Sequence, residues 1–460
     1  MGRLQRRSFL GLGVAGGLNL FPVHTDTALG SVVNGRAKNV LVILEQGGLS
    51  HMDTWDPKPD APADHRSIYK PISTNVAGMQ FTELLSKTAK VADKLTVIRS
   101  MHHKVSNANG HPQGTRYALS GEVPGGPVEM PDIGSVVAHN IGSRCNYLPP
   151  YIMIPGNHEQ AKETSQGFLR ASTKVFKTGG KNLADPNWTV PNLGLMAGID
   201  QARFNDRRDL LSNLNLGVAA EQNTTAYALQ QLSTQAADLL TNPRTQKAFR
   251  LNDEPDSIRD KYGRGHRGQC YLLGRRMIEA GVRFVTIDVR EPETDQTPGG
   301  SNMNWDHHDY IYANGSCGTI RNGAGGEGRF GIGHWVMMGS TDQAFAALIQ
   351  DLDDRGMLDE TLVCFVTEFG RTPRMNFFQG RDHWTHGYSI VMSGAGVPGG
   401  QVVGSTDREG GYVQDRPYTP EDYAATIYEK LGIDRSKPLF TPSNRPVFVA
   451  HHATPISEVF

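Results

Sequence analysis

Short apolar runs rich in valine, isoleucine and leucine recur along this chain, and they constrain its fold more than any other feature. The first run covers residues 39–45 and is followed by Gln46, Gly47 and Gly48. A strand buried on both faces shows such an unbroken run, whereas a half-exposed strand alternates apolar and polar residues. The runs therefore predict buried, mostly parallel strands. Five more runs of this kind occupy residues 95–101, 151–155, 283–289, 362–370 and 388–394.

Two other segments have the spacing of amphipathic helices. Residues 340–357 lie between the runs at 283–289 and 362–370, and residues 421–433 lie near the C-terminal end. In the first segment, Ser340 and Gln343 resemble a capping box, and Gly356 is placed to end the helix. A strand, a helix and a second strand form the unit that builds parallel sheets. We predict an α/β fold with a doubly wound, mostly parallel sheet covered on both faces.

Residues 190–260 have a different pattern. They are rich in alanine, glutamine, asparagine and leucine at helical spacing, as in TAYALQQLSTQAADLL at 225–240, and contain few strand formers. A chain of 460 residues is long enough for one large α/β domain with an excursion. We predict that residues 190–260 form a mainly helical insertion in that domain.

The N-terminal residues differ in composition from the rest of the chain. Arg6 and Arg7 precede the sequence SFLGLGVAGG, which is apolar but too short and too rich in glycine to span a bilayer. This arrangement is typical of a twin-arginine export signal, which we assign to residues 1–30. It predicts a periplasmic or extracellular protein. No later segment reaches 18 apolar residues, so we expect no stable membrane span.

The charge balance excludes one class of partner. The chain has 46 lysines and arginines against 47 aspartates and glutamates, a formal net charge of −1. Binding to nucleic acid or to anionic lipid relies on an excess of positive charge, so neither is expected as the main partner. The four cysteines lie far apart and show none of the spacings of zinc or redox motifs.

Acidic and histidine side chains follow several of the predicted strands. Asp306 and His308 come one loop after the run at 283–289, Glu368 ends the run at 362–370, and His383 comes just before the run at 388–394. In an open α/β sheet, ligands bind beyond the carboxyl ends of the strands, where the loops converge. We therefore predict that Asp306, His308, Glu368 and His383 bind a divalent metal ion, either zinc, calcium or magnesium.

The arguments for these residues differ, and Glu368 has an ordinary alternative. A lone glutamate at a strand end is often an ion-pair or cap residue, and Arg371 stands three positions after Glu368. Three adjacent titratable groups, Asp306, His307 and His308, are costly to bury unless they are paired or bound to a metal. Asp382 and Arg381 could hold His383 in place as partners behind a metal site.

The stretch SNANGHPQGTRYALSG, residues 106–121, precedes what looks like a helix start. A group placed there would gain from the helix dipole and the free amides. Ser106, His111, Thr115 and Ser120 all qualify by residue type, and none stands in a G-x-S-x-G elbow. We select His111 as the first candidate for a catalytic group, acting as acid, base or unusual nucleophile.

Seven segments in order resemble those of the bacterial domain-of-unknown-function family 1501. They are GGLSHMDTWDPKPD (47–60), LTVIRSMHHK (95–104), residues 259–287, WDHH (305–308), TEFGRTPRMN (367–376), GRDHW (380–384) and GGQVVGSTDREG (399–410). That family is grouped with alkaline phosphatases and sulfatases, which are metal-dependent enzymes acting on phosphate and sulfate esters. The resemblance implies a sulfatase-like α/β domain over residues 38–460, with its metal site at the strand ends.

The chain departs from this pattern at several positions. Active members have an aspartate after the first strand, where this chain has Glu45 and Gln46, and an Asp-His pair after a late strand, where it has Glu368 and Phe369. The position of the hydroxyl nucleophile falls near Gly110 or His111. Our hypothesis is an exported metal-dependent hydrolase of sulfate or phosphate esters on small molecules or polysaccharides. The alternative is a non-catalytic sugar- or anion-binding protein on the same fold.

Overall fold

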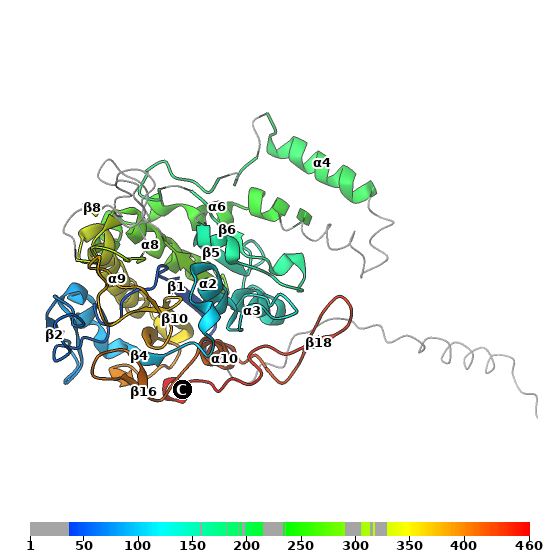
Figure 1. The fold of residues 1–460 in the computed structure, drawn as a ribbon. Coiled ribbons are helices and arrows are strands. Elements are labelled where there is room, and N and C mark those ends of the chain that lie inside the picture. The colour runs from blue at the N-terminus through cyan, green and yellow to red at the C-terminus, as the bar shows by residue number, and fades with distance from the viewer. Residues whose placement is uncertain are drawn as a thin grey trace, which may run out of the picture.

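A central sheet of eight strands organises the protein (Figure 1). The computed structural model describes residues 36–156, 159–180, 182–191, 193–195, 198–214, 233–234, 236–289, 305–312, 316–317 and 329–460. The strands, in their order across the sheet, are β14 (Gln401–Val403), β4 (Thr96–Met101), β13 (Tyr388–Ser393), β10 (Thr361–Val366), β1 (Asn39–Leu44), β7 (Phe284–Asp288), β5 (Tyr151–Pro155) and β6 (Phe176–Lys177).

The sheet is mostly parallel, as the sequence predicts. Strand β13 runs antiparallel to both of its neighbours, β10 and β4, and the other pairs in the sheet are parallel. All six predicted strands are present, and they are buried over most of their length. Their unbroken apolar runs are therefore explained by burial on both faces.

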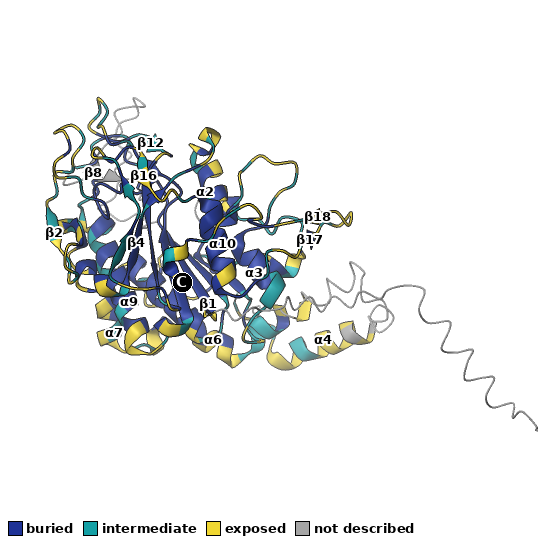
Figure 2. Cartoon of the chain, turned by 90° about the horizontal axis from the view of Figure 1, so that it is seen from below, coloured by how far each residue is buried: buried dark blue, intermediate teal, exposed yellow. Residues whose placement is uncertain are grey.

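Helices cover both faces of this sheet. Side chains on alternate positions of β1 enter two separate cores, with Leu41 and Ile43 in one and Val40 and Val42 in the other. Helices α8 (His266–Glu279) and α9 (Ser340–Asp354) pack into the first core. The second core includes residues of α2 (His111–Ser120), α3 (Ile133–Ile141) and α10 (Pro420–Lys430). This is the doubly wound arrangement, and Figure 2 shows its buried centre.

The two predicted helices are present, but one of them begins in an unexpected way. The capping box predicted from Ser340 and Gln343 is wrong, because a π-helical turn, η9 (Trp335–Gly339), runs directly into α9. The Ser340 hydroxyl instead donates to the carbonyl of Val336 at 2.8 Å. Gly356, at φ +66°, follows the end of this helix as predicted.

Helix α10 does have a capping box. The Thr419 hydroxyl and the Thr419 backbone amide both donate to the Asp422 carboxylate, at 2.7 and 2.9 Å. A Ser or Thr cap followed three residues later by an acidic residue satisfies donors that the first helical turn leaves open.

The segment predicted as a helical insertion contains α4 (Gln201–Leu214), α6 (Pro243–Phe249) and the first residues of α7 (Asp256–Tyr262). Phe249 of α6 enters the core, whereas most of α4 is exposed and lies at the margin of the molecule (Figure 2). Residues 215–232 lie outside the described residues, as does the predicted export signal at 1–30. Within the described ranges, no helix combines the length and apolar character needed to cross a bilayer.

The topology brings five chain segments to one edge of the sheet. Strands β1, β4, β7 and β10 run in one direction, so their carboxyl ends share this edge. Strand β13 runs the opposite way, so the residues before Tyr388 are delivered to the same edge. Side chains far apart in the sequence therefore meet there.

Candidate metal centre

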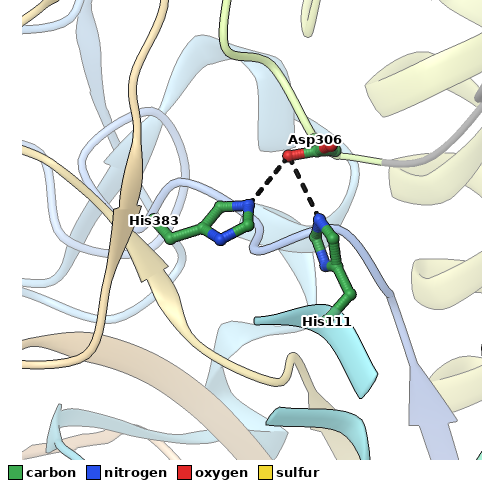
Figure 3. A group of neighbouring side chains, drawn as sticks. All are labelled: His111, Asp306 and His383. Carbon is green, nitrogen blue, oxygen red and sulfur yellow. Dashed lines mark hydrogen bonds and ion pairs between the residues drawn. The ribbon is translucent and has the colours of Figure 1, made fainter. Parts of the chain in front are cut away.

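The structure brings all five of the predicted site residues into one group of contacts. His111 is the first residue of α2, Asp306 and His308 follow β7, and Glu368 follows β10. His383 lies in β12 (His383–Trp384), just before β13. Figure 3 shows the imidazoles of His111 and His383 pointing toward Asp306 from two sides.

One carboxylate oxygen, Oδ1 of Asp306, is the centre of this group. The Nε2 atoms of His308, His383 and His111 lie 2.9, 3.1 and 3.2 Å from it. The Nε2 atoms of His308 and His383 are also only 3.0 Å apart. In the set formed by His111, Asp306 and His383, the potential ligand atoms all lie within 4.8 Å of one another, which is close enough to hold one metal ion.

Each of the three imidazoles is held from behind through its other nitrogen, Nδ1. An imidazole that ligates a metal through one nitrogen almost always donates its other N–H to a carboxylate or carbonyl, which fixes the tautomer and the direction of the ring. The same pattern occurs here three times. The acceptors are Glu368 Oε1 at 2.8 Å from His111, Asp382 Oδ1 at 2.7 Å from His308, and Asn109 O at 2.7 Å from His383.

This arrangement fits a divalent cation. With Nδ1 protonated, each neutral imidazole turns the lone pair of Nε2 toward the Asp306 carboxylate, and two such groups repel each other unless a proton or a cation lies between them. The Nε2 atom of His111 is buried and, although close to Asp306, has no hydrogen bond of good geometry. Imidazole nitrogens with one carboxylate oxygen are a common ligand set for zinc.

Glu368 lies behind this centre and is completely buried. One of its carboxylate oxygens, Oε1, accepts from the backbone amide of Gly47 at 2.7 Å and faces Nδ1 of His111. The other, Oε2, accepts from the hydroxyl of Thr367 at 3.1 Å. Glu368 is not a member of the three-residue group that can hold an ion. Its contacts instead hold His111 in position.

Arg371 pairs with Asp306 and not with Glu368. It lies in β11 (Gly370–Arg371), directly opposite His383 in an antiparallel pair, so both side chains reach the same place. Its Nη2 atom is 2.5 Å from Asp306 Oδ1, and its Nε atom donates to the carbonyl of Gly48 at 2.9 Å. Arg371 is fully buried and thus fixes the Asp306 carboxylate. The sequence shows Arg371 only as a neighbour of Glu368, because the pairing with Asp306 depends on the β11–β12 register.

Gly47 allows the Asp306 segment to approach β1. A Cβ atom at this position would lie 2.4 Å from the backbone nitrogen of Trp305 and 2.6 Å from that of Asp306. Gly47 also has φ +107°, which side-chain-bearing residues rarely adopt. The indole of Trp305 donates to the buried Glu45 carboxylate at 2.8 Å, and Arg267 pairs with the same carboxylate. These contacts anchor the chain immediately before Asp306.

The charges of the centre depend on one another. Burial would raise the pKa of Asp306, but Arg371 and the imidazoles hold it well below its usual range. Burial likewise opposes ionisation of Glu368, yet its hydrogen bond and charge contact with His111 lower the pKa. The same two carboxylates overcome burial at His111 and raise its pKa to about 9. The pKa of His383 is lowered, first by burial and also by Arg371 and His111. The site therefore keeps both carboxylates ionised.

Other polar residues after the first strand are engaged elsewhere. Asp53 is fully buried and pairs with Arg381 at 3.1 Å, while the Asp56 carboxylate accepts from the Thr406 hydroxyl at 2.6 Å. His103, which is not among the predicted site residues, also lies near the centre, with its Nε2 atom 2.8 Å from the backbone carbonyl of Glu368. The signal that could have indicated it is its position two residues after the end of β4.

No hydroxyl nucleophile is placed at the centre within the described part of the chain. No serine, threonine or cysteine side chain there hydrogen bonds to His111 or His383. Gly110 is the N-cap of α2, so the helix start offers His111 in the place where a hydroxyl is expected.

Comparison with solved structures finds proteins of low similarity. A sulfatase, PsFucS1, from Pseudoalteromonas sp. is 13% identical, with 87% of this chain and 69% of that chain covered and a TM-score of 0.32. A phosphonate monoester hydrolase of Agrobacterium radiobacter is 13% identical, with coverage of 86% and 74% and a TM-score of 0.35. The lipoteichoic acid synthase LtaP from Listeria monocytogenes is 10% identical, with coverage of 88% and 76% and a TM-score of 0.34.

Comparison by sequence is more informative. No curated protein matches the chain. One family model, described as "Protein of unknown function (DUF1501)", matches residues 37–460, which is nearly the whole chain and agrees with the seven segments singled out in the sequence. The protein therefore belongs to the DUF1501 family.

Proposed function

We propose that this protein is an exported, metal-dependent hydrolase that acts on sulfate or phosphate esters. The observation that carries the proposal is the convergence of three imidazole Nε2 atoms on one oxygen of Asp306, each imidazole being held through Nδ1 by a separate acceptor. Purely structural histidines have no need of this double orientation. Export rests on the paired arginines at positions 6 and 7 and would carry the folded protein out of the cytoplasm.

We assign the ligands to His111, Asp306 and His383. Catalytic zinc sites use three protein ligands and leave one position open for water or substrate, which matches a set of this size. The nitrogen-rich set favours zinc over calcium and magnesium, which prefer oxygen ligands. When bound, the cation supplies a Lewis acid that polarises an ester oxygen and lowers the pKa of a water molecule.

The remaining residues have supporting roles in this proposal. Glu368 orients His111, and Arg371 holds the Asp306 carboxylate in place. His308 is the most exposed of the three imidazoles, with 22% of its side chain accessible, against 15% for His111 and 17% for His383. Since its Nδ1 atom is held by Asp382, its Nε2 atom can exchange a proton with a group bound at the open side. We assign His308 as the acid or base.

One observation favours a second candidate function. Among the described residues, no hydroxyl occupies the nucleophile position at the start of α2. A protein that keeps its metal but has no group to attack the ester would bind a sugar or an anion without cleaving it. An attacking water molecule removes this difficulty, so the two functions differ in whether turnover occurs.

Metal analysis and turnover of generic esters test the proposal. We expect the purified protein to contain about one equivalent of zinc and to hydrolyse an aryl sulfate or an aryl phosphate. The His383→Ala variant should lose both the metal and the activity. The matched control is His452→Ala, because His452 is an exposed histidine in a turn near the C-terminal end and is not among the residues of the centre.

The possible results separate the candidates. Bound metal without turnover of either ester would support the binding protein and reject the hydrolase. An absence of metal after expression with zinc, manganese and calcium in the medium would reject both. Loss of metal in His452→Ala as well would mean that the metal binds elsewhere.

A further inference from the structure

A surface hollow of about 410 Å³ lies within the long loop that follows β1. We call it the basic hollow, because three of the residues that line it are cationic and none is acidic. A hollow of this volume can hold part of a ligand. The residues are Pro57, Lys58, Pro59, Ala63, Arg66, Ser67, Ile68, Tyr69, Lys70 and Pro71.

The charge of the basic hollow is largely uncompensated. Lys58 lies 3.1 Å from the Asp56 carboxylate, so its charge is partly used. Arg66 and Lys70 are exposed, and within the described residues no hydrogen bond or ion pair involves either side chain. Two cations that share one hollow and have no carboxylate partner attract an anionic group. Both side chains are therefore available to an external anion.

The basic hollow also has an apolar wall. Ile68 is 60% exposed, which is unusual for a large aliphatic side chain. Tyr69 is held in place by an edge contact with Tyr312, at 5.8 Å between ring centroids. Prolines at 57, 59 and 71 complete the lining. A ligand with apolar surface and negative charge would use both parts of the hollow, and a sulfated sugar has both.

Arg381 connects the basic hollow to the candidate metal centre. Its guanidinium donates to the carbonyl of His65 and to the hydroxyl of Tyr312, at 2.7 and 2.9 Å. Its backbone amide donates to the carbonyl of His307, between Asp306 and His308. His65 lies in the segment that lines the hollow, and the ring of Tyr312 contacts Tyr69, so the two sites share one buried support.

We propose that the basic hollow binds a second sulfate group of a sulfated polysaccharide whose ester is held at the metal centre. The inference rests on the proposed function and narrows its substrate to a polymer with repeated sulfate groups. Arg66 and Lys70 bind the sulfate oxygens, and Ile68 and Tyr69 contact the adjoining sugar ring. A small aryl ester has only one anionic group, so it can fill only one of the two sites.

Binding of dextran sulfate provides the test. We expect the double variant Arg66→Ala, Lys70→Ala to bind dextran sulfate about tenfold more weakly at low salt, with the slope of log K against log salt smaller by roughly 1.5. Turnover of an aryl sulfate should stay unchanged. The charge-preserving variant Arg66→Lys, Lys70→Arg should restore most of the binding. The matched control, Arg207→Ala with Arg208→Ala, removes two exposed arginines from α4.

The outcomes distinguish this inference from the proposed hydrolase. Binding is measured in wild type and in His383→Ala, so it does not depend on turnover. Equal binding by the double variant and by wild type would overturn the proposal that the basic hollow binds sulfate, even if aryl sulfate is hydrolysed. Linear polyphosphate is the second probe, and binding as tight as that of dextran sulfate would reject a site for sugars. Dextran without sulfate should not bind. If it does bind, the charges of Arg66 and Lys70 are not responsible for binding, and the proposal is overturned.

Discussion

The two ends of helix α2 bury carboxyl groups in opposite electrostatic surroundings. At its first residue, His111, the carboxylates of Asp306 and Glu368 face imidazoles and Arg371. At its other end, Glu122 and Asp132 line a hollow of about 250 Å³. We call this second region the acidic hollow, and its lining also includes Ser120, Arg116 and Glu163.

The acidic hollow contains one arginine, Arg116, but this arginine is already paired with Glu163. The Nε atom of Arg116 donates to Glu163 at 2.6 Å. Burial therefore dominates for Glu122 and Asp132 and raises the pKa of both to about 7. The backbone amide of Ser165 donates to the Asp132 carboxyl at 3.1 Å, which offsets only part of the cost of burial.

This difference shows that burial alone does not decide the ionisation of a carboxyl group. At the start of α2, an arginine and imidazoles offset the cost of burial and keep the carboxylates charged. At its end, the more distant charge of Lys177 is too weak to do so for Asp132. A divalent cation needs carboxylates that stay ionised when they are buried, whereas a neutral carboxyl group is a weak ligand.

The largest effect is expected from replacing His111 with alanine. This change removes one ligand and leaves Glu368 buried without its main partner. We expect the metal content to fall close to zero and turnover of an aryl ester to fall by roughly 10³ or more, since a metal ion contributes several kcal/mol of charge stabilisation. Metal analysis and initial rates measure both. His451→Ala, at an exposed position, is the control. Full metal content in His111→Ala would remove this residue from the ligand set.

The next largest effect separates the two possible roles of His308. In His308→Ala, we expect the metal to remain and turnover to fall by about 10²–10⁴, the usual contribution of a general acid or base. Metal content and rate are measured on the same sample. If the metal is lost together with activity, His308 is a ligand, as the sequence first suggested, and the assignment of the proton-transfer role to it is wrong.

Much of the fold was predictable from the sequence, because buried strands have a strong local signal. The apolar runs at 39–45 and 362–370 correspond to β1 and β10, whose side chains fill a core on each face. The start of α9 was not predictable from a local motif. The π-helical turn before Ser340 depends on how that segment packs, and Ser340 then bonds back to Val336.

The candidate site was predictable as a location but not as a set of roles. A polar residue at a strand end indicates the edge where it lies, so Asp306, Glu368 and His383 could be placed together. Whether Asp306 or Glu368 lies at the centre, and which of them lies behind it, depends on side-chain contacts that form only in the folded structure. Arg371 reaches Asp306 only because the β11–β12 register places it opposite His383, and no sequence spacing encodes that choice.

A smaller effect is expected from Glu368→Gln, which tests the contact behind the centre. The amide oxygen can still accept from Gly47 and His111, but the negative charge is lost. We expect metal affinity to fall about 10–100-fold, the usual cost of changing a residue that orients a ligand. Competition with a chelator of known affinity measures it. Glu429→Gln, at an exposed position of α10, is the control. Complete loss of metal would indicate that Glu368 ligates the ion directly.

The smallest effect is expected at the acidic hollow, from Asp132→Asn. The native pKa of Asp132 is about 7, above its unfolded value, so the native protein holds a proton there that the unfolded chain releases. This group therefore lowers the free energy of unfolding as pH rises from about 4 to 7, and its cost is fully present above pH 7. We expect Asp132→Asn to be more stable than wild type by about 2 kcal/mol at pH 8.

The pH dependence of that difference is the decisive measurement. Groups shared by the two proteins cancel when their unfolding free energies are subtracted, so the difference reports Asp132 alone. It should shrink as pH falls and be close to zero near pH ~3, where wild-type Asp132 is largely protonated in both states. Asp434→Asn is the control, because Asp434 has a lowered pKa and should show the opposite sign. A difference that is constant with pH would mean that Asp132 is ionised in the native protein, and the contrast between the two ends of α2 would then be lost.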